Sequence, residues 1–137
     1  MSYLFDSDRV VDYLKGQADA IALLTDLTAD YSAISVITYG EVYEGIYYGR
    51  DPQQTERGFE RFLDDVVVLP LGRDVARIFA RVRGGLRRSG QLISDTDLFI
   101  AATALQYDLT LVTRNVRHFE RIPDLKLLSA PLEQADS

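Results

Sequence analysis

Acidic residues stand where apolar, strand-like runs give way to helix-like segments. Asp6 directly follows the run Tyr3–Phe5 and precedes a helical pattern. Glu41 stands at the start of a helix that follows a second apolar run, and Asp95 and Asp97 stand at the start of a later, alanine-rich helix. In open α/β sheets, functional groups gather at the carboxyl ends of strands. Three separated segments therefore each bring a carboxylate to a place where a metal ligand could lie.

Carboxylates in this arrangement are typical of metal-assisted phosphodiester chemistry. Hard cations such as Mg²⁺ and Mn²⁺ prefer oxygen ligands, usually a few carboxylates plus waters. Such ions lower the pKa of bound water and clamp both oxygens of a phosphodiester displacement. The candidate ligands and catalytic residues are Asp6, Glu41 and Asp97. Asp95 and Asp97 are two positions apart, so a helix projects them to different sides. We choose Asp97 because it leads directly into the apolar run 98–102.

Each acid also has a purely structural interpretation. Ser7 or Asp8 could cap the first helix. The segments Thr38–Glu41 and Ser94–Asp97 both fit the spacing of a capping box, and the helix dipole favours acids in the first turn without any catalysis. For a single acid, capping explains the position at least as well as catalysis. The conjunction of three acidic sites in one short chain favours the catalytic interpretation.

Apolar runs alternate with helix-length segments along the chain. The runs near residues 3–5, 33–34, 66–69, 109–112 and 125–128 read as strands covered on both faces, as in parallel sheets. Helices are expected near residues 10–16, 20–27, 38–49, 59–63, 75–82 and 98–105. This order predicts an α/β fold, a three-layer sandwich with a central, mostly parallel sheet flanked by helices. We expect one domain over residues 1–132 and a loose tail over residues 133–137.

Arginines are concentrated in one segment although the formal net charge is −6. Six arginines lie between positions 73 and 88, with Asp74 as the one acid among them. Arginine recognises phosphate through a planar, bidentate fork, so this segment is a candidate surface for a nucleic-acid backbone. Arg81, Arg87 and Arg88 are the candidate residues for binding a nucleic-acid backbone. The alternative is an exposed helix face whose charge serves solubility.

Length and composition limit the number of domains, the types of metal site and the cellular location that we expect. The chain has 137 residues and no cysteine, which suits one compact domain and excludes disulfides and thiolate metal sites. The N-terminal residues do not have the pattern of a signal peptide. No apolar run approaches the ~20 residues that a membrane-spanning helix needs. We therefore expect a soluble, cytoplasmic protein with no membrane partner.

Four segments, in order, resemble the motifs of the PIN-domain family, and in particular its VapC-like toxins. Residues 3–8, followed by 10–14, resemble the family's opening strand, which ends in Asp-Thr/Ser-Asn. Residues 35–41 with Gly45 resemble the second motif, and residues 97–104 the third. Residues 111–115 with Phe119 resemble the closing segment of VapC-like toxins. The resemblance spans nearly the whole chain.

This resemblance implies an Mg²⁺- or Mn²⁺-dependent endoribonuclease that forms a homodimer and is inhibited by an antitoxin filling the site. Asp6, Glu41 and Asp97 match the family's core acids. The chain departs at the fourth position, because members commonly carry an acid in place of Asn115 or of His118. Asn115 could still offer a neutral oxygen ligand, and His118 a water or phosphate contact. The other auxiliary candidates are Ser7, Asp95 and Thr113.

Three alternatives stay open at this point. The segment Asp6–Asp8 after a strand also resembles the nucleophile motif of haloacid-dehalogenase-type phosphohydrolases. Those enzymes need a well-placed lysine and a cap, whereas this chain has only Lys15 and Lys126. A receiver-like signalling domain needs a mid-chain acceptor after its third strand, but Asp64–Asp65 precedes that strand. A catalytically inactive PIN-like binding module is the third alternative.

Overall fold

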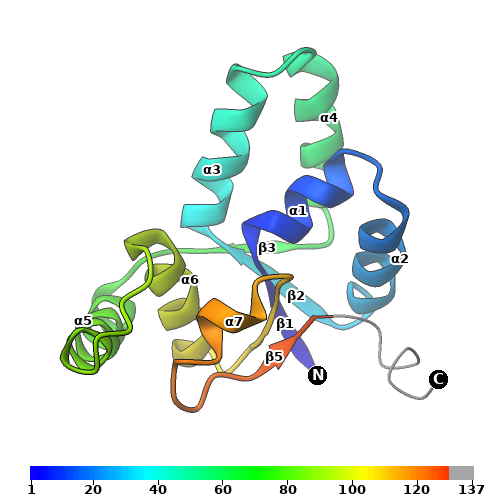
Figure 1. Ribbon diagram of the computed structural model, residues 1–137. Coiled ribbons are helices and arrows are strands. Elements are labelled where there is room, and N and C mark those ends of the chain that lie inside the picture. The colour runs from blue at the N-terminus through cyan, green and yellow to red at the C-terminus, as the bar shows by residue number, and fades with distance from the viewer. Residues whose placement is uncertain (130–137) are drawn as a thin grey trace.

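A five-stranded parallel sheet forms the centre of the computed structural model, which describes residues 1–129 (Figure 1). The strand order is β3-β2-β1-β4-β5, and every neighbouring pair is parallel. The strands are β1 (Ser2–Phe5), β2 (Tyr31–Ser35), β3 (Val67–Leu69), β4 (Thr110–Val112) and β5 (Leu127–Leu128). The predicted tail over residues 133–137 lies outside the described residues.

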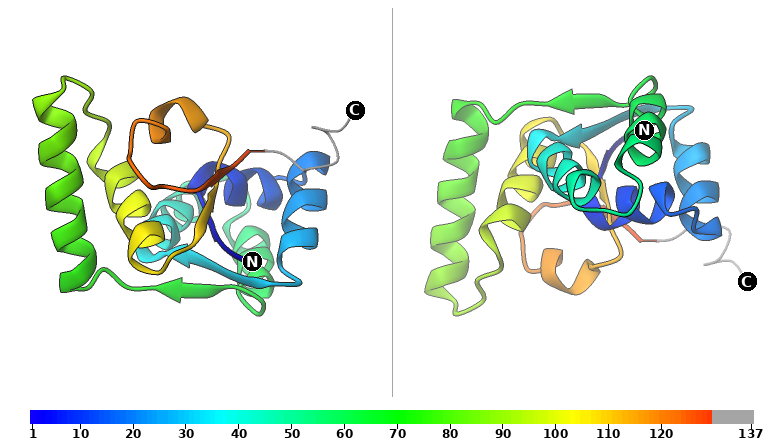
Figure 2. Two further views of the ribbon diagram at one scale, coloured as in Figure 1. Left: turned by 90° about the horizontal axis from the view of Figure 1, so that it is seen from below. Right: turned by 90° about the horizontal axis from the view of Figure 1, so that it is seen from above.

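Helices cover both faces of this sheet (Figure 2). One side carries α1 (Ser7–Leu14), α2 (Ala18–Leu27), α3 (Val36–Tyr47) and α4 (Pro52–Phe62). The other side carries α5 (Arg73–Arg88), α6 (Asp95–Gln106) and α7 (Val116–Phe119). The predicted three-layer α/β sandwich is confirmed. Within residues 1–129, the helices all fall short of the length and apolar character required to cross a membrane.

Strand β1 is buried on both faces, which anchors the residue that follows it. Leu4 and Phe5 are both fully buried, yet they belong to two separate hydrophobic clusters. Successive side chains of a strand point to opposite faces, so Phe5 packs under α1–α4 while Leu4 packs under α5–α7. The run 3–5 is continuously apolar because both faces of β1 are covered by helices. Asp6 therefore leaves a strand that is held from both sides.

The chain changes direction across the sheet beside β1. It runs from β1 through β2 to β3 on one side and then returns to β4 on the other side of β1. The ends of β1 and β4 lie in register, with Phe5 opposite Val112, and the Asp6 N–H donates to the Val112 carbonyl at 2.9 Å. Open α/β sheets bind their ligands at such a switch point, outside the carboxyl ends of the strands.

Two helix starts differ from expectation. Helix α3 begins at Val36 rather than near Thr38, because the Ser35 side chain accepts from the Ile37 N–H at 3.0 Å and caps it. Glu41 therefore lies in the second turn of α3, and the capping box predicted at Thr38–Glu41 is wrong. The β-branched run after Ser35 had concealed this helix start.

The first helix is capped by Asp6 itself, whose Oδ1 accepts from the Ser7 N–H at 2.8 Å, and not by Ser7 or Asp8. Strands β3, β4 and β5 are each shorter than predicted, and the four-residue helix α7 was not predicted. The sixth helix begins as expected, with Ser94 as its cap accepting from the Asp97 N–H at 3.2 Å.

Candidate active site

Asp6 is a buried carboxylate at the switch point of the sheet. Only 5% of the residue is exposed. Its Oδ2 accepts from the Thr113 hydroxyl at 2.7 Å, so the ends of β1 and β4 are joined by a side-chain hydrogen bond. Burial is the main cause that raises the pKa of Asp6 to about 7, and the nearby carboxylates of Asp8 and Asp97 raise it further against the opposing hydrogen bonds. A positive charge placed here would relieve this cost.

Asp8 joins the first turn of α1 to the loop after β4. Its Oδ2 accepts from the Arg114 backbone N–H at 3.0 Å and lies 3.4 Å from Thr113 Oγ1. The Arg114 guanidinium extends across the same turn, with Nε 2.9 Å from Asp12 Oδ2. Burial raises the pKa of Asp8, while Arg114 opposes that shift. Asp8 therefore holds the Thr113 loop against α1 and adds negative potential beside Asp6.

Glu41 reaches the site through Ser7. The Ser7 hydroxyl donates to Glu41 Oε1 at 2.6 Å, and its oxygen lies 2.9 Å from Thr38 Oγ1. Thr38 is fully buried one turn before Glu41 on α3. Residues three apart share a helix face, so α3 presents Thr38 and Glu41 together to the start of α1. Glu41 therefore lies beside Ser7, the residue that follows Asp6 in the sequence.

Asp95 and Asp97 contact different partners, as their spacing requires. Asp97 Oδ2 lies 3.7 Å from His118 Nδ1, and the negative charge of Asp97 contributes to raising the pKa of Asp6. Asp95 Oδ1 instead accepts from Arg83 Nε of α5 at 2.9 Å. Asp95 is thus engaged in a contact between α5 and α6, and the choice of Asp97 as the ligand stays a prediction.

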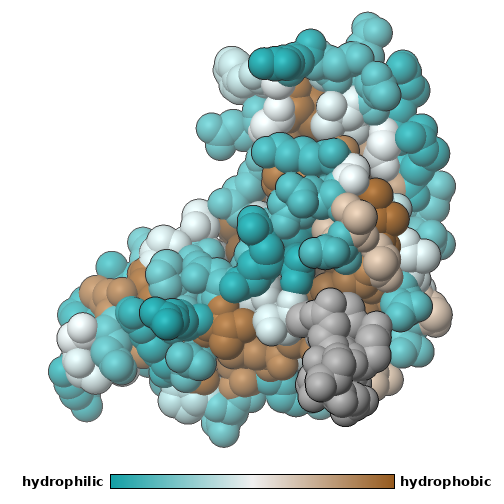
Figure 3. Space-filling view, turned by 45° about the vertical axis from the view of Figure 1, so that its right-hand side comes forward, coloured by the Kyte–Doolittle hydropathy of each residue, from teal (hydrophilic) through white to brown (hydrophobic). Residues whose placement is uncertain are grey.

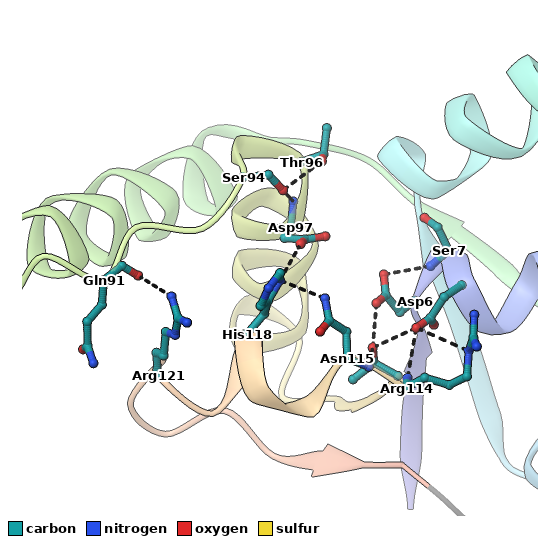
Figure 4. A network of polar contacts seen from close by, with 12 residues as sticks. Asp6, Ser7, Gln91, Ser94, Thr96, Asp97, Arg114, Asn115, His118 and Arg121 are labelled. Atoms are coloured by element: carbon teal, nitrogen blue, oxygen red, sulfur yellow. Dashed lines mark hydrogen bonds and ion pairs between the residues drawn. The ribbon is translucent and has the colours of Figure 1, made fainter.

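Asn115 and His118 contact each other near Thr113 and Asp97. Asn115 Nδ2 lies 2.8 Å from His118 Nδ1, and the Asn115 N–H donates to Thr113 Oγ1 at 2.9 Å. His118 belongs to α7 and contacts the Asp97 carboxylate (Figure 4). The two residues at which the chain departs from the PIN motifs therefore contact each other, and His118 also contacts Asp97, an acid of the predicted set.

The donor set suits a hard cation. Asp6, Glu41 and Asp97 offer carboxylate oxygens, and Ser7 and Thr113 offer hydroxyls, which are the ligand types that Mg²⁺ and Mn²⁺ accept. The raised pKa of buried Asp6 also fits a site that gains from positive charge. Within residues 1–129, no three acidic or histidine side chains lie close enough together to form a complete cage of metal ligands. A cation that keeps several of its waters does not require such a cage.

The arginine segment forms α5 and is divided among several contacts. Arg83 pairs with Asp95, and Arg77 pairs with Asp74. The predicted RNA-binding residues Arg81, Arg87 and Arg88 are exposed. The space-filling view shows a mostly hydrophilic surface in the angle between the α3–α4 arm and the α5 arm (Figure 3).

Sequence analysis missed Asp8, Thr38 and Arg114 as parts of this network. The pair Asp6–Asp8 was a usable signal, because two acids after one strand end lie near the same switch point. The partner of Asp8 is 106 positions away in the sequence, and no local pattern indicates such a contact. Thr38 was interpreted as a helix cap, which hid its buried hydroxyl.

Comparison with known proteins agrees with this geometry. The family model described as PIN domain matches residues 3–125. Ribonuclease VapC19 from Mycobacterium tuberculosis is 36% identical over 125 residues, covering 90% of this chain and 96% of the relative. The crystal structure of VapBC2 from Rickettsia felis bound to a promoter DNA fragment superposes with a TM-score of 0.87 at 26% identity, covering 96% of this chain and all of the matched chain.

A toxin–antitoxin complex from Klebsiella pneumoniae superposes with a TM-score of 0.72 at 27% identity, covering 93% and 97% of the two chains. The haloacid-dehalogenase and receiver-like interpretations are not favoured by these matches. The fold, the order of the motifs and the matched length agree with one another, and the chain belongs to the PIN-domain family, among the VapC ribonucleases.

Proposed function

We propose that this chain is a metal-dependent endoribonuclease and the toxin of a toxin–antitoxin pair. The observation that carries the proposal is the Asp6 carboxylate, which is buried at the switch point of the sheet and whose pKa is raised to about 7 beside Asp8 and Asp97. A protein keeps a buried carboxylate among other acids at a cost to folding, and a function that needs the negative charge offsets that cost.

Asp6, Glu41 and Asp97 would hold Mg²⁺ or Mn²⁺, each oriented by neighbouring groups. The Ser7 N–H and the Thr113 hydroxyl fix the two oxygens of Asp6. The Ser7 hydroxyl fixes Glu41. When bound, the cation supplies activation of a water and neutralisation of charge on the phosphodiester.

The remaining polar residues would act on the substrate and on the ligands. Asn115 and His118 are in contact, and His118 also contacts Asp97, so the pair can hold a phosphate oxygen or a water close to that carboxylate. Thr113 and Ser7 act as positioning residues, because each directs a carboxylate oxygen through a hydrogen bond. Asp95 is assigned no role in the reaction, since Arg83 engages it.

Arg81, Arg87 and Arg88 would bind the RNA backbone. All three are exposed on α5, which packs against α6, the helix that carries Asp97. Arginine on a helix beside the site can neutralise several phosphates of one strand. Because RNA is the proposed substrate, we place the activity in the cytoplasm.

The proposed partners are a cognate antitoxin, which blocks the site, and a second copy of this chain. Membership of the VapC ribonucleases and the likeness to a chain of the toxin–antitoxin complex from Klebsiella pneumoniae support the antitoxin. Homodimerisation rests on the family resemblance. Co-expression with the antitoxin and light scattering of the free toxin would test these two partners separately.

A cleavage assay on mixed cellular RNA tests the activity. We expect the wild type to cleave with Mg²⁺ or Mn²⁺ and to stop in EDTA. Asp97→Asn should lose cleavage, whereas the matched control Asp95→Asn should retain it, because the two acids share one helix turn but face different partners. Cleavage that persists in EDTA would refute the metal mechanism. A folded wild type that binds RNA without cutting it would be the inactive binding module.

A further inference from the structure

A pocket with an apolar interior and charged walls lies against α5, on the side of the sheet that α5, α6 and α7 cover. It is formed by α5, the end of α6 and the segment after α7. Val82, Leu86 and Leu105 supply apolar surface, and Arg81 and Arg121 supply two guanidinium groups. We call it the α5–α7 pocket. No residue assigned above to the metal or to the phosphate under attack lines it.

The α5–α7 pocket is connected to the active site through α7. Arg121 follows α7, the helix whose His118 contacts Asp97, and Arg121 NH1 donates to the Gln91 carbonyl at 3.3 Å. Gln91, Arg121, His118 and Asn115 follow one another toward Asp6 in Figure 4. Leu105 of the pocket is eight residues beyond Asp97 on α6, which corresponds to about 12 Å along the helix. A strand bound at Asp97 can therefore extend to this pocket.

We propose that the α5–α7 pocket binds an unpaired nucleobase of the RNA, next to the bond that is cut, and so contributes to the choice of cleavage position. This inference rests on the proposed ribonuclease activity. Proteins recognise RNA chiefly through unstacked bases that pack on apolar or guanidinium planes and are hydrogen-bonded at their edges. The pocket offers Leu86 and Leu105 as an apolar surface for the base and Gln91 as a polar group for its edge.

Charge favours RNA over a protein segment as the occupant. Arg81 and Arg121 line the pocket together with one acid, Asp124, so the lining has an excess of positive charge. Phosphates on either side of a bound base would pair with the guanidinium groups. An apolar peptide in the same place would have to desolvate the two arginines without offering a charge in return. The position of the pocket on the path from Asp97 supports the same choice.

Two adjacent glycines of α5 allow a matched test. A Cβ added at Gly84 or at Gly85 would meet no atom within 4 Å, so both positions have room for a side chain to begin. Only Gly85 lines the α5–α7 pocket. Gly85→Phe should therefore fill the pocket, whereas Gly84→Phe makes the same substitution in the same helix and leaves the pocket open.

The experiment is an abasic scan. A single-stranded RNA that the wild type cleaves is prepared as a series in which one nucleotide at a time lacks its base. We expect the wild type to lose about tenfold in cleavage rate when the missing base is at one or two fixed positions from the cut, in keeping with the value of stacking one base. Gly84→Phe should keep this position dependence. Gly85→Phe should cleave every member of the series at one similar, reduced rate.

Several results would overturn the inference. One is a flat wild-type scan, and another is a Gly85→Phe scan that matches the wild type. A change of oligomeric state in Gly85→Phe with an unchanged scan would assign the pocket to a protein contact instead. Because the intact RNA is included in every series, a wild type that fails to cut it refutes the proposed ribonuclease itself. A wild type that cuts it with a flat scan refutes only the base pocket.

Discussion

Asp6→Asn should stabilise the metal-free protein at neutral and alkaline pH. In the folded chain burial and neighbouring acids raise the pKa of Asp6 from 3.8 to about 7. Between these two pH values the folded state binds a proton that the unfolded chain has released, so the free energy of unfolding falls as the pH rises. The stability that protonated Asp6 provides is fully present below about pH 4 and is lost once the pH has passed about 7.

The size of the effect follows from the pKa. A change from 3.8 to about 7 corresponds to at most about 4 kcal/mol, at ~1.36 kcal/mol per pH unit. Asparagine keeps the shape of Asp6, caps a helix equally well and removes the buried charge. The variant should therefore match the wild type near pH 4 and exceed its free energy of unfolding by up to about 4 kcal/mol at pH 8.

Urea denaturation in EDTA at several pH values measures this difference. Asp64→Asn is the control, because Asp64 is exposed and lies between α4 and β3, away from the site. It removes the same charge and should change little at any pH. If Asp6→Asn destabilises the protein at pH 8, then the hydrogen bonds from Ser7 and Thr113 outweigh the cost of the buried charge, and our account of the site's electrostatics is wrong.

Three further predictions concern ligands and substrate. Asp97→Asn should abolish cleavage yet leave the thermal midpoint in EDTA unchanged or higher, because its charge repels Asp6; a large drop would make Asp97 a structural cap. Replacing Arg81, Arg87 and Arg88 with alanine should weaken RNA binding and flatten its dependence on salt; unchanged RNA affinity with lost dimerisation or antitoxin binding would assign α5 to a protein interface. Asn115→Asp should tighten Mn²⁺ binding in calorimetry, since a carboxylate replaces an amide; no gain would mean that another acid already fills the fourth place.

The main features of the fold could be predicted from local patterns. Apolar runs covered on both faces predicted a parallel sheet, and the polar residue after the first run was predicted to lie at the strand end. Asp6 is found there because Phe5 and Leu4 pack into separate clusters on the two faces. Boundaries were less predictable. Val36 begins a helix although it opens a β-branched run, because the Ser35 side chain caps that helix.

The parts of the site that escaped prediction depend on contacts between distant residues. Spacing showed that Asp95 and Asp97 must diverge, but their contacts with Arg83 and with His118, respectively, show which way each one turns. Asp8 looked like a helix cap, whereas it accepts from the Arg114 N–H in the loop after the neighbouring strand β4. Such contacts are made by tertiary packing, and a single sequence carries no signal for them.

Calorimetric titration with Mn²⁺ tests the central claim most directly, because it measures the proposed metal site without relying on cleavage. The wild type should bind one ion well. Three variants each remove one proposed ligand and should bind Mn²⁺ much more weakly: Asp6→Asn, Glu41→Gln and Asp97→Asn. Asp95→Asn is the control, because it removes a neighbouring acid that Arg83 holds, and its Mn²⁺ binding should be unchanged. Unchanged binding in all three ligand variants, or equal loss in the control, would contradict the proposal that Asp6, Glu41 and Asp97 hold the catalytic ion.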